Sequence, residues 1–76
     1  MKKVYILKET DVSDNETIIH GVFDSLNLLN CNISQSYLKN NINKKFEHES
    51  DEFYYPNIYN VECVYKVEFF LINKMN

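Results

Sequence analysis

The sequence predicts an α+β fold in which one helix, or two short helices, packs on a small antiparallel sheet of three or four strands. Two segments near the N-terminus are rich in β-branched and aromatic residues and flank a polar stretch, which predicts a β-hairpin. Apolar residues recur at helical spacing in the middle of the chain, and the last part alternates apolar with polar residues. We therefore expect the order hairpin, helical segment, then one or two further strands.

The N-terminal hairpin is predicted from two short runs. Val4–Leu7 is apolar at every position, which is typical of a strand covered on both faces or lying in the middle of a small sheet. Residues 9–16 are polar and rich in turn formers, and Thr17–Phe23 reads as a second strand. Because the gap between the two runs is short, an antiparallel hairpin is the simplest connection.

The helical segment is expected within residues 25–45. Asp24 or Ser25 can cap its first turn, because either side-chain oxygen can accept a free backbone N–H. Many asparagines weaken the helix, so a break near residues 32–34 with a new cap is compatible with the pattern. The apolar residues fall into two offset stripes, namely Leu26, Leu29, Ile33 and Tyr37, and then Leu38, Ile42 and Phe46.

The C-terminal segment alternates most regularly and predicts a half-buried strand. One face is wholly apolar, and the other is polar, apart from Val64, until Phe70 and Ile72. Such a strand extends about 40 Å, so we expect a bend or a bulge in it. A short strand at Phe53–Tyr55 and a turn at Pro56-Asn57 are predicted before it. The expected core face consists of Val61, Cys63, Tyr65, Val67, Phe69 and Leu71.

Length and composition exclude several classes of protein. The 76 residues, with a mass of 9.1 kDa, suffice for a single small domain spanning residues 1–76. The net charge is -3 and every basic residue is Lys, so direct nucleic-acid binding is not expected. No apolar run is long enough to span a membrane or to form a leader, and the two cysteines lie far apart. We expect a soluble, cytoplasmic protein with reduced thiols and no membrane partner.

Two short motifs resemble a family of small uncharacterised bacterial and phage domains. That family has a Lys-Val-Tyr-x-Leu strand and an Ile-Ile-Gly-Val-Phe-Ser-Ser-like junction between strand and helix. Here Lys3–Leu7 and Ile18–Ser25 are similar to these motifs, with His20 as an extra residue inside the second. The resemblance covers the first third of the chain and the order of elements. It departs in the helix, which lacks the family's Glu, Lys and Ala, and it implies no functional residue.

The patterns expected of catalytic and metal sites are lacking. His20 lies within a strand, and we interpret it as a solvent-facing or hydrogen-bonded residue of the sheet. The residues that could supply zinc ligands, His20, Cys31, His48 and Cys63, contain none of the close pairs typical of zinc sites. Residues 11–16 lack the Gly and Glu that a calcium loop requires. We therefore predict no metal, no cofactor and no enzymatic activity.

One acidic and aromatic segment is the candidate partner-binding site. Two interpretations remain open for it. It is either a solvated charge run whose aromatic residues pack as cross-strand neighbours, or a patch whose acids steer a basic partner and whose tyrosines provide contact area. The candidate partner-binding residues are Glu47, Glu49, Asp51, Glu52, Phe53, Tyr54, Tyr55 and Tyr59.

Taken together, these observations favour a small, non-catalytic protein-binding module. The abundance of Asn, Ile, Lys and Tyr indicates an AT-rich coding sequence, as in low-GC bacteria and their phages. We expect a phage or mobile-element accessory protein that inhibits a basic host or defence protein by direct contact. The alternative is a structural or assembly protein that forms a homodimer through exposed strand edges.

Overall fold

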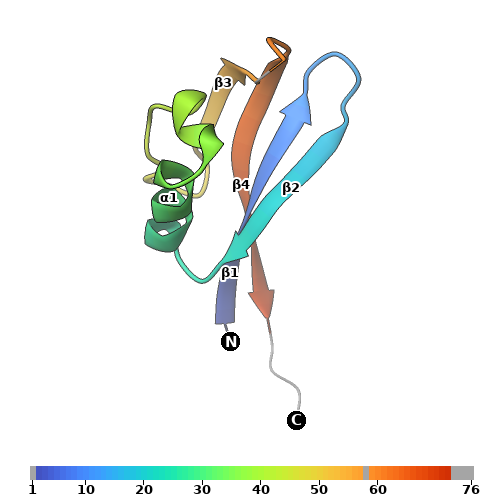
Figure 1. The fold of residues 1–76 in the computed structure, drawn as a ribbon. Helices are drawn as coiled ribbons and strands as arrows, with labels where there is room; N and C mark the ends of the chain where they lie inside the picture. The colour runs from blue at the N-terminus through green and yellow to red at the C-terminus, as the bar shows by residue number, and fades with distance from the viewer. Residues whose placement is uncertain (1, 58, 73–76) are drawn as a thin grey trace.

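Four antiparallel strands form one sheet in the order β2-β1-β4-β3 in the computed structural model, which describes residues 2–57 and 59–72 (Figure 1). The predicted α+β class and the N-terminal hairpin are confirmed. The apolar N-terminal strand lies in the middle of the sheet, because it pairs with strands on both sides. The strands are β1 (Lys2–Asp11), β2 (Thr17–Phe23), β3 (Glu52–Pro56) and β4 (Glu62–Ile72).

The hairpin of β1 and β2 is longer than the sequence predicts. Glu9 and Thr10, which were expected in the polar loop, belong to β1. Cross-strand partners explain the difference: Glu9 bonds to His20, and the Thr10 and Thr17 hydroxyls lie 3.0 Å apart. The turn itself uses Asn15, whose φ of 63° is a left-handed conformation that Asn tolerates well.

A bulge interrupts β2 at His20. Leu7 pairs with Gly21 and Lys8 pairs with Ile19, so His20 is the residue without a direct partner in β1. A side chain at the neighbouring Gly21 would displace the Phe23 ring, because a Cβ there would come within 2.7 Å of it. Of the bend or bulge expected in the last strand, the bulge is absent: β1 and β4 pair in an unbroken register, and the irregularity lies in β2.

The helical segment is split into two short pieces, as its composition predicts. An α-helix, α1 (Leu26–Ser34), is followed by a 3₁₀-helix, η1 (Tyr37–Asn40). Ser25 caps α1, accepting from Leu28 N over 3.1 Å, and Ser36 caps η1, accepting from Leu38 N over 3.2 Å. The break falls at residues 35–36, just after the predicted position.

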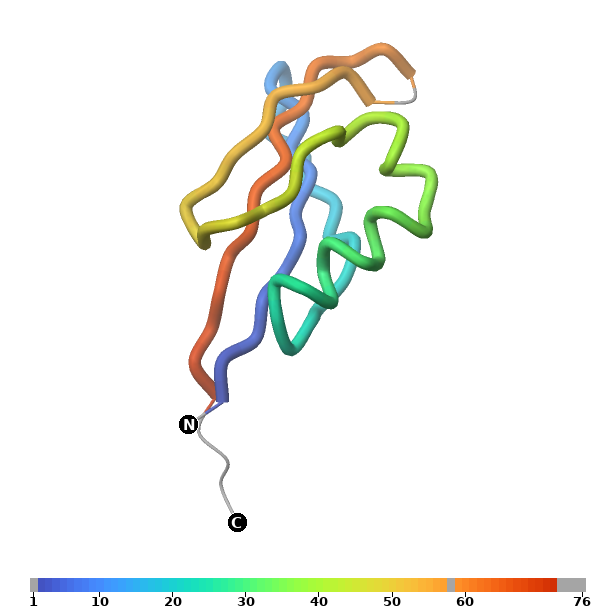
Figure 2. The backbone as a smooth tube through the Cα atoms, turned by 90° about the vertical axis from the view of Figure 1, so that its left-hand side faces the viewer, coloured from blue at the N-terminus to red at the C-terminus, as the bar shows by residue number. Residues whose placement is uncertain are grey.

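The helices and the segment that follows them cover one face of the sheet. Figure 2 shows the chain running from η1 back across β1 and β4 before it enters β3. This layer contributes Leu29, Ile33, Leu38, Ile42 and Phe46 to the core, and the sheet contributes Leu7, Cys63, Tyr65 and Val67. Within the described residues, no helix has the length and apolar character needed to cross a membrane.

The core face of β4 ends earlier than its sequence predicts. Cys63, Tyr65 and Val67 are buried, but Phe69 is 43% exposed and Leu71 is 59% exposed. Both continue the apolar alternation, but the covering layer buries the face only as far as Val67.

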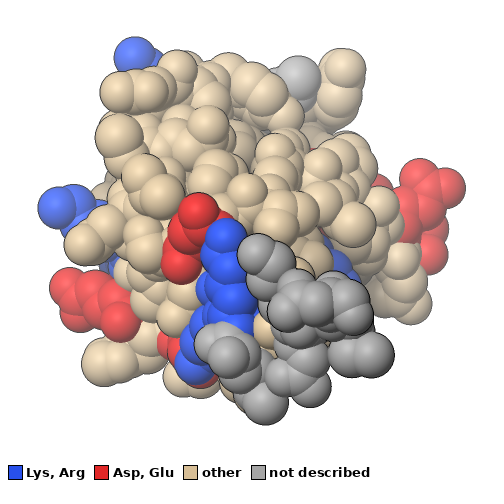
Figure 3. Space-filling model, turned by 90° about the horizontal axis from the view of Figure 1, so that it is seen from below, with Lys and Arg blue, Asp and Glu red and all other residues tan. Residues whose placement is uncertain are grey.

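Viewed from the end at which β1 begins, most of the described surface carries neither Lys nor acidic side chains (Figure 3).

Candidate functional site

A buried, hydrogen-bonded carboxylate lies between β1 and β2. Glu9 is only 6% exposed, and its Oε1 lies 2.9 Å from His20 Nε2. The bulge in β2 places the His20 side chain on the same face as Glu9. The His20 ring also makes an edge-to-face contact with the Tyr37 ring. His20 is therefore a hydrogen-bonded residue of the sheet, which is one of the two roles that its position predicts.

Two further polar side chains of β4 surround the Glu9 carboxylate. Cys63 Sγ lies 3.7 Å from Glu9 Oε2, and Tyr65 Oη is buried without a hydrogen-bond partner among the described residues. Burial and the charge of Glu9 raise the pKa of the Cys63 thiol to about 11 and also raise the pKa of Tyr65. Both groups therefore stay protonated near neutral pH and are poor nucleophiles.

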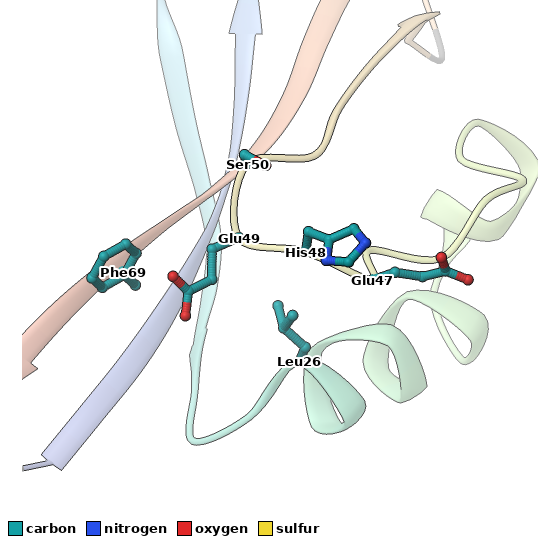
Figure 4. A pocket seen from close by; sticks show the side chains of 6 residues that line it. All are labelled: Leu26, Glu47, His48, Glu49, Ser50 and Phe69. Atoms are coloured by element: carbon teal, nitrogen blue, oxygen red, sulfur yellow. The ribbon is translucent and has the colours of Figure 1, made fainter.

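A cleft of about 570 Å³ lies between the start of α1 and the far end of β4. Figure 4 shows the Glu49 carboxylate pointing towards Phe69 across this cleft. Lys3 forms an ion pair with Glu49, and its ammonium lies 4.2 Å from the centre of the Phe69 ring. The Tyr5 hydroxyl donates to Glu49 over 3.3 Å. The charge of Glu49 is thus balanced within the chain.

The acidic part of the candidate partner-binding segment supports its own loop. Asp51 Oδ2 accepts hydrogen bonds from Glu47 N over 2.8 Å and from His48 N over 2.9 Å. These backbone donors lower the pKa of Asp51. Of the four acids proposed, Glu49 and Asp51 have structural contacts, while Glu47 and Glu52 are exposed.

The aromatic part of the segment is divided between two faces of β3. Phe53 packs on Phe46 with 4.7 Å between ring centres, and Tyr55 donates to Asn43 Oδ1 over 2.6 Å. Tyr54 points to the opposite face and is 59% exposed, and Tyr59 lies in the following turn. The eight candidate residues are therefore not gathered into one continuous surface. Alternation along Phe53–Tyr55 was the signal that could have separated them.

The sheet face turned away from the helices, called the open face below, carries several exposed apolar side chains. Ile19 and Val22 of β2 are both 59% exposed, and sequence analysis did not single them out. Lys8 and Glu68 form an ion pair near the centre of this face. By pairing register, the face also includes Val4, Ile6, Thr10, Thr17, Glu52, Tyr54, Val64, Lys66, Phe70 and Ile72.

The four side chains considered as zinc ligands do not form a site. No group of three or more His, Cys, Asp or Glu side chains within residues 2–57 and 59–72 is placed to hold a metal ion. Cys63 is buried in the core and Cys31 is exposed on α1, and both are free thiols.

Comparisons with protein-family models, with curated proteins and with solved structures found no match. The chemistry of the surfaces described above is therefore the basis for inferring what the protein does.

Proposed function

We propose that this protein is a small, non-catalytic protein-binding module that contacts its partner through the open face of its sheet. The observation that supports this most directly is the exposure of Ile19 and Val22 beside Ile6 on a face that no described element covers. Apolar side chains gathered on one exposed face are typical of interaction sites.

The arrangement of charges on the open face also supports protein contact. Lys8, Lys66 and Glu52 occupy one row across β1, β4 and β3, and the apolar residues lie mainly to one side of it. An apolar centre beside polar and charged groups is the usual composition of a protein–protein interface. Glu52 and Tyr54 are the two members of the acidic and aromatic segment that fall on this face.

The net charge of -3 favours a basic partner, because opposite charge accelerates encounter between proteins. A phage or mobile-element accessory protein that inhibits a basic host or defence protein by direct contact would have these properties. We propose this role for the module.

A pair of neighbouring residues gives a sharp test. Ile18 and Ile19 are 55% and 59% exposed but point to opposite faces of β2, because they pair with Glu9 and Lys8. Each is replaced by Lys, and the tagged variants are used for quantitative affinity purification from the native host cells. A protein that co-purifies with the wild type and with Ile18→Lys, but not with Ile19→Lys, is the expected result.

Circular dichroism first establishes that both variants are folded. Equal recovery of every co-purifying protein by Ile18→Lys and Ile19→Lys would contradict the open face as the binding surface. The two variants change net charge by the same amount, so a difference between them reports the face and not the charge.

A further inference from the structure

The second half of β4 has a strand on one side only. β1 pairs with β4 along Cys63–Ile72, whereas β3 pairs with it only along Glu62–Lys66. Among the residues that the structure describes, Val67–Ile72 therefore presents an open edge on the side of β3. Alternate N–H and C=O groups along such an edge point outwards and are available for another strand.

The other two edges of the sheet carry the features that usually prevent pairing between proteins. β3 is only five residues long and ends at Pro56, which cannot donate a hydrogen bond. β2 is interrupted by the bulge at His20. Val67–Ile72 contains no Pro, and its register with β1 is unbroken.

The side chains of this open edge resemble those of an interior strand. Phe69, Phe70, Leu71 and Ile72 are consecutive apolar residues and are 43%, 47%, 59% and 46% exposed. Strands that are apolar on both faces are normally flanked by strands on both sides. The sequence of Val67–Ile72 is thus typical of a strand paired on both sides, although this segment is paired only with β1 among the described residues.

We propose that this edge of β4 pairs with the same edge of a second copy of the chain. The two strands run antiparallel, and the twofold axis that relates them passes midway between the two copies of Phe70. Opposite residues then share a face, as the pleat requires. Phe70 meets Phe70 of the second copy on the open face, and Phe69 meets Leu71 on the other. The remaining pair is Glu68 with Ile72, and Lys8 already balances the charge of Glu68.

Local charge favours a second copy despite the net charge of -3. Two acidic side chains close to the open edge are balanced within the chain: Lys3 pairs with Glu49, and Lys8 pairs with Glu68. In Figure 3, which views this end of the molecule, most of the described surface is uncharged. Two copies can therefore approach here with little repulsion. This contact is separate from the partner surface proposed above and does not depend on it.

Light scattering over a range from micromolar to millimolar concentration tests the assembly. We expect the mass to rise from one chain of 9.1 kDa towards two. Phe70→Lys places two like charges opposite each other at the axis and should keep the protein monomeric. Ile19→Lys, which adds the same charge to the open face of β2, should still dimerise.

A disulfide trap tests the register. In a Cys31→Ser background, Phe70→Cys should form a cross-linked dimer rapidly under mild oxidation, because directly opposite residues lie about 4.5–5.5 Å apart. Phe69→Cys should react more slowly, because it would lie diagonal to its counterpart at about 7–8 Å. Ile19→Cys should not cross-link.

Constant mass of one chain at every concentration would overturn the proposal, and that result would point to a strand from another protein as the occupant. Equal cross-linking of Phe70→Cys and Ile19→Cys would also overturn it, even if Phe70→Lys failed to fold. If Ile19→Lys lost partner binding but had the same mass in solution as the wild type, the open face would be supported as the partner surface. The dimer would still be judged by the mass and cross-linking measurements alone.

Discussion

Glu9 and His20 form a buried carboxylate–imidazole pair across the β1–β2 hairpin, with 2.9 Å between Oε1 and Nε2. Each side chain provides a hydrogen-bond partner for the other. Without that partner, the remaining polar group would be buried unsatisfied, which lowers the stability of so small a protein. Cys63 and Tyr65 complete the polar surroundings of Glu9 without ionising. The pair therefore stabilises the hairpin, and its two members should be energetically coupled.

Replacing His20 by Ala should lower the free energy of unfolding by about 1–3 kcal/mol, because it leaves the Glu9 carboxylate buried without its partner. The double variant Glu9→Leu, His20→Ala should cost less than the sum of its two single variants, Glu9→Leu and His20→Ala. Urea unfolding followed by circular dichroism measures all three. Strictly additive effects would show that the pair is not coupled.

The two thiols should differ sharply in reactivity. With a pKa of about 11, Cys63 has only about one thousandth of its population as thiolate at pH 8. Cys31 is exposed. Alkylation of the folded protein should therefore modify Cys31 alone, and mass spectrometry after digestion identifies the site. Rapid labelling of Cys63 in the folded state would contradict its burial, and denaturant should make both thiols react.

Stability should depend on pH through Asp51. Its carboxylate accepts two backbone N–H groups in the folded state, which lower its pKa below the usual 3.8. The ionised form is therefore the stabilising one, and its contribution is present above pH 3.8 and is lost as the pH falls through the folded-state pKa. Asp51→Ala should melt at a lower temperature than the wild type at pH 7, and the gap should narrow as the solution is acidified. A gap that stays constant down to pH 2 would argue against this role.

The limit of the core along β4 can be tested with one substitution at two positions. Val67 is 7% exposed and Leu71 is 59% exposed, although both belong to the same face of the strand. Val67→Asp buries an unpaired charge and should unfold the protein, whereas Leu71→Asp should change the unfolding free energy of the monomer by about 0.5 kcal/mol or less. Both are measured by thermal melting at low micromolar concentration, which favours the monomer. A cooperative, unshifted melt of Val67→Asp would contradict the core assignment.

Local patterns were sufficient to predict most of the architecture. Alternation predicted β4, the apolar run Val4–Leu7 predicted a strand in the middle of the sheet, and Ser25 was among the predicted caps. Each of these signals lies within a few residues of the element that it specifies. Such short-range signals can be read without knowing which strands pair.

The remaining features depend on contacts between distant residues. Glu9 reads as a loop residue until His20, eleven positions further on, is known to face it. Phe69 and Leu71 continue the apolar pattern of the core, and only the position of α1 shows that the covering layer does not reach them. Glu49 and Asp51 also belong here: their contacts with Lys3 and with the backbone of their own loop follow from the path of the loop, which composition does not specify.

The bulge at His20 makes β2 respond differently to a deletion at that residue and to deletions elsewhere in the strand. Removing His20 would leave Ile19 opposite Lys8 and Ile18 opposite Glu9, because the pairing already skips position 20. Ile19 would stay on the open face, and the cost would be the loss of the imidazole that bonds to Glu9. A library that shortens the chain one codon at a time should therefore find position 20 more tolerant of deletion than the regularly paired positions of β2.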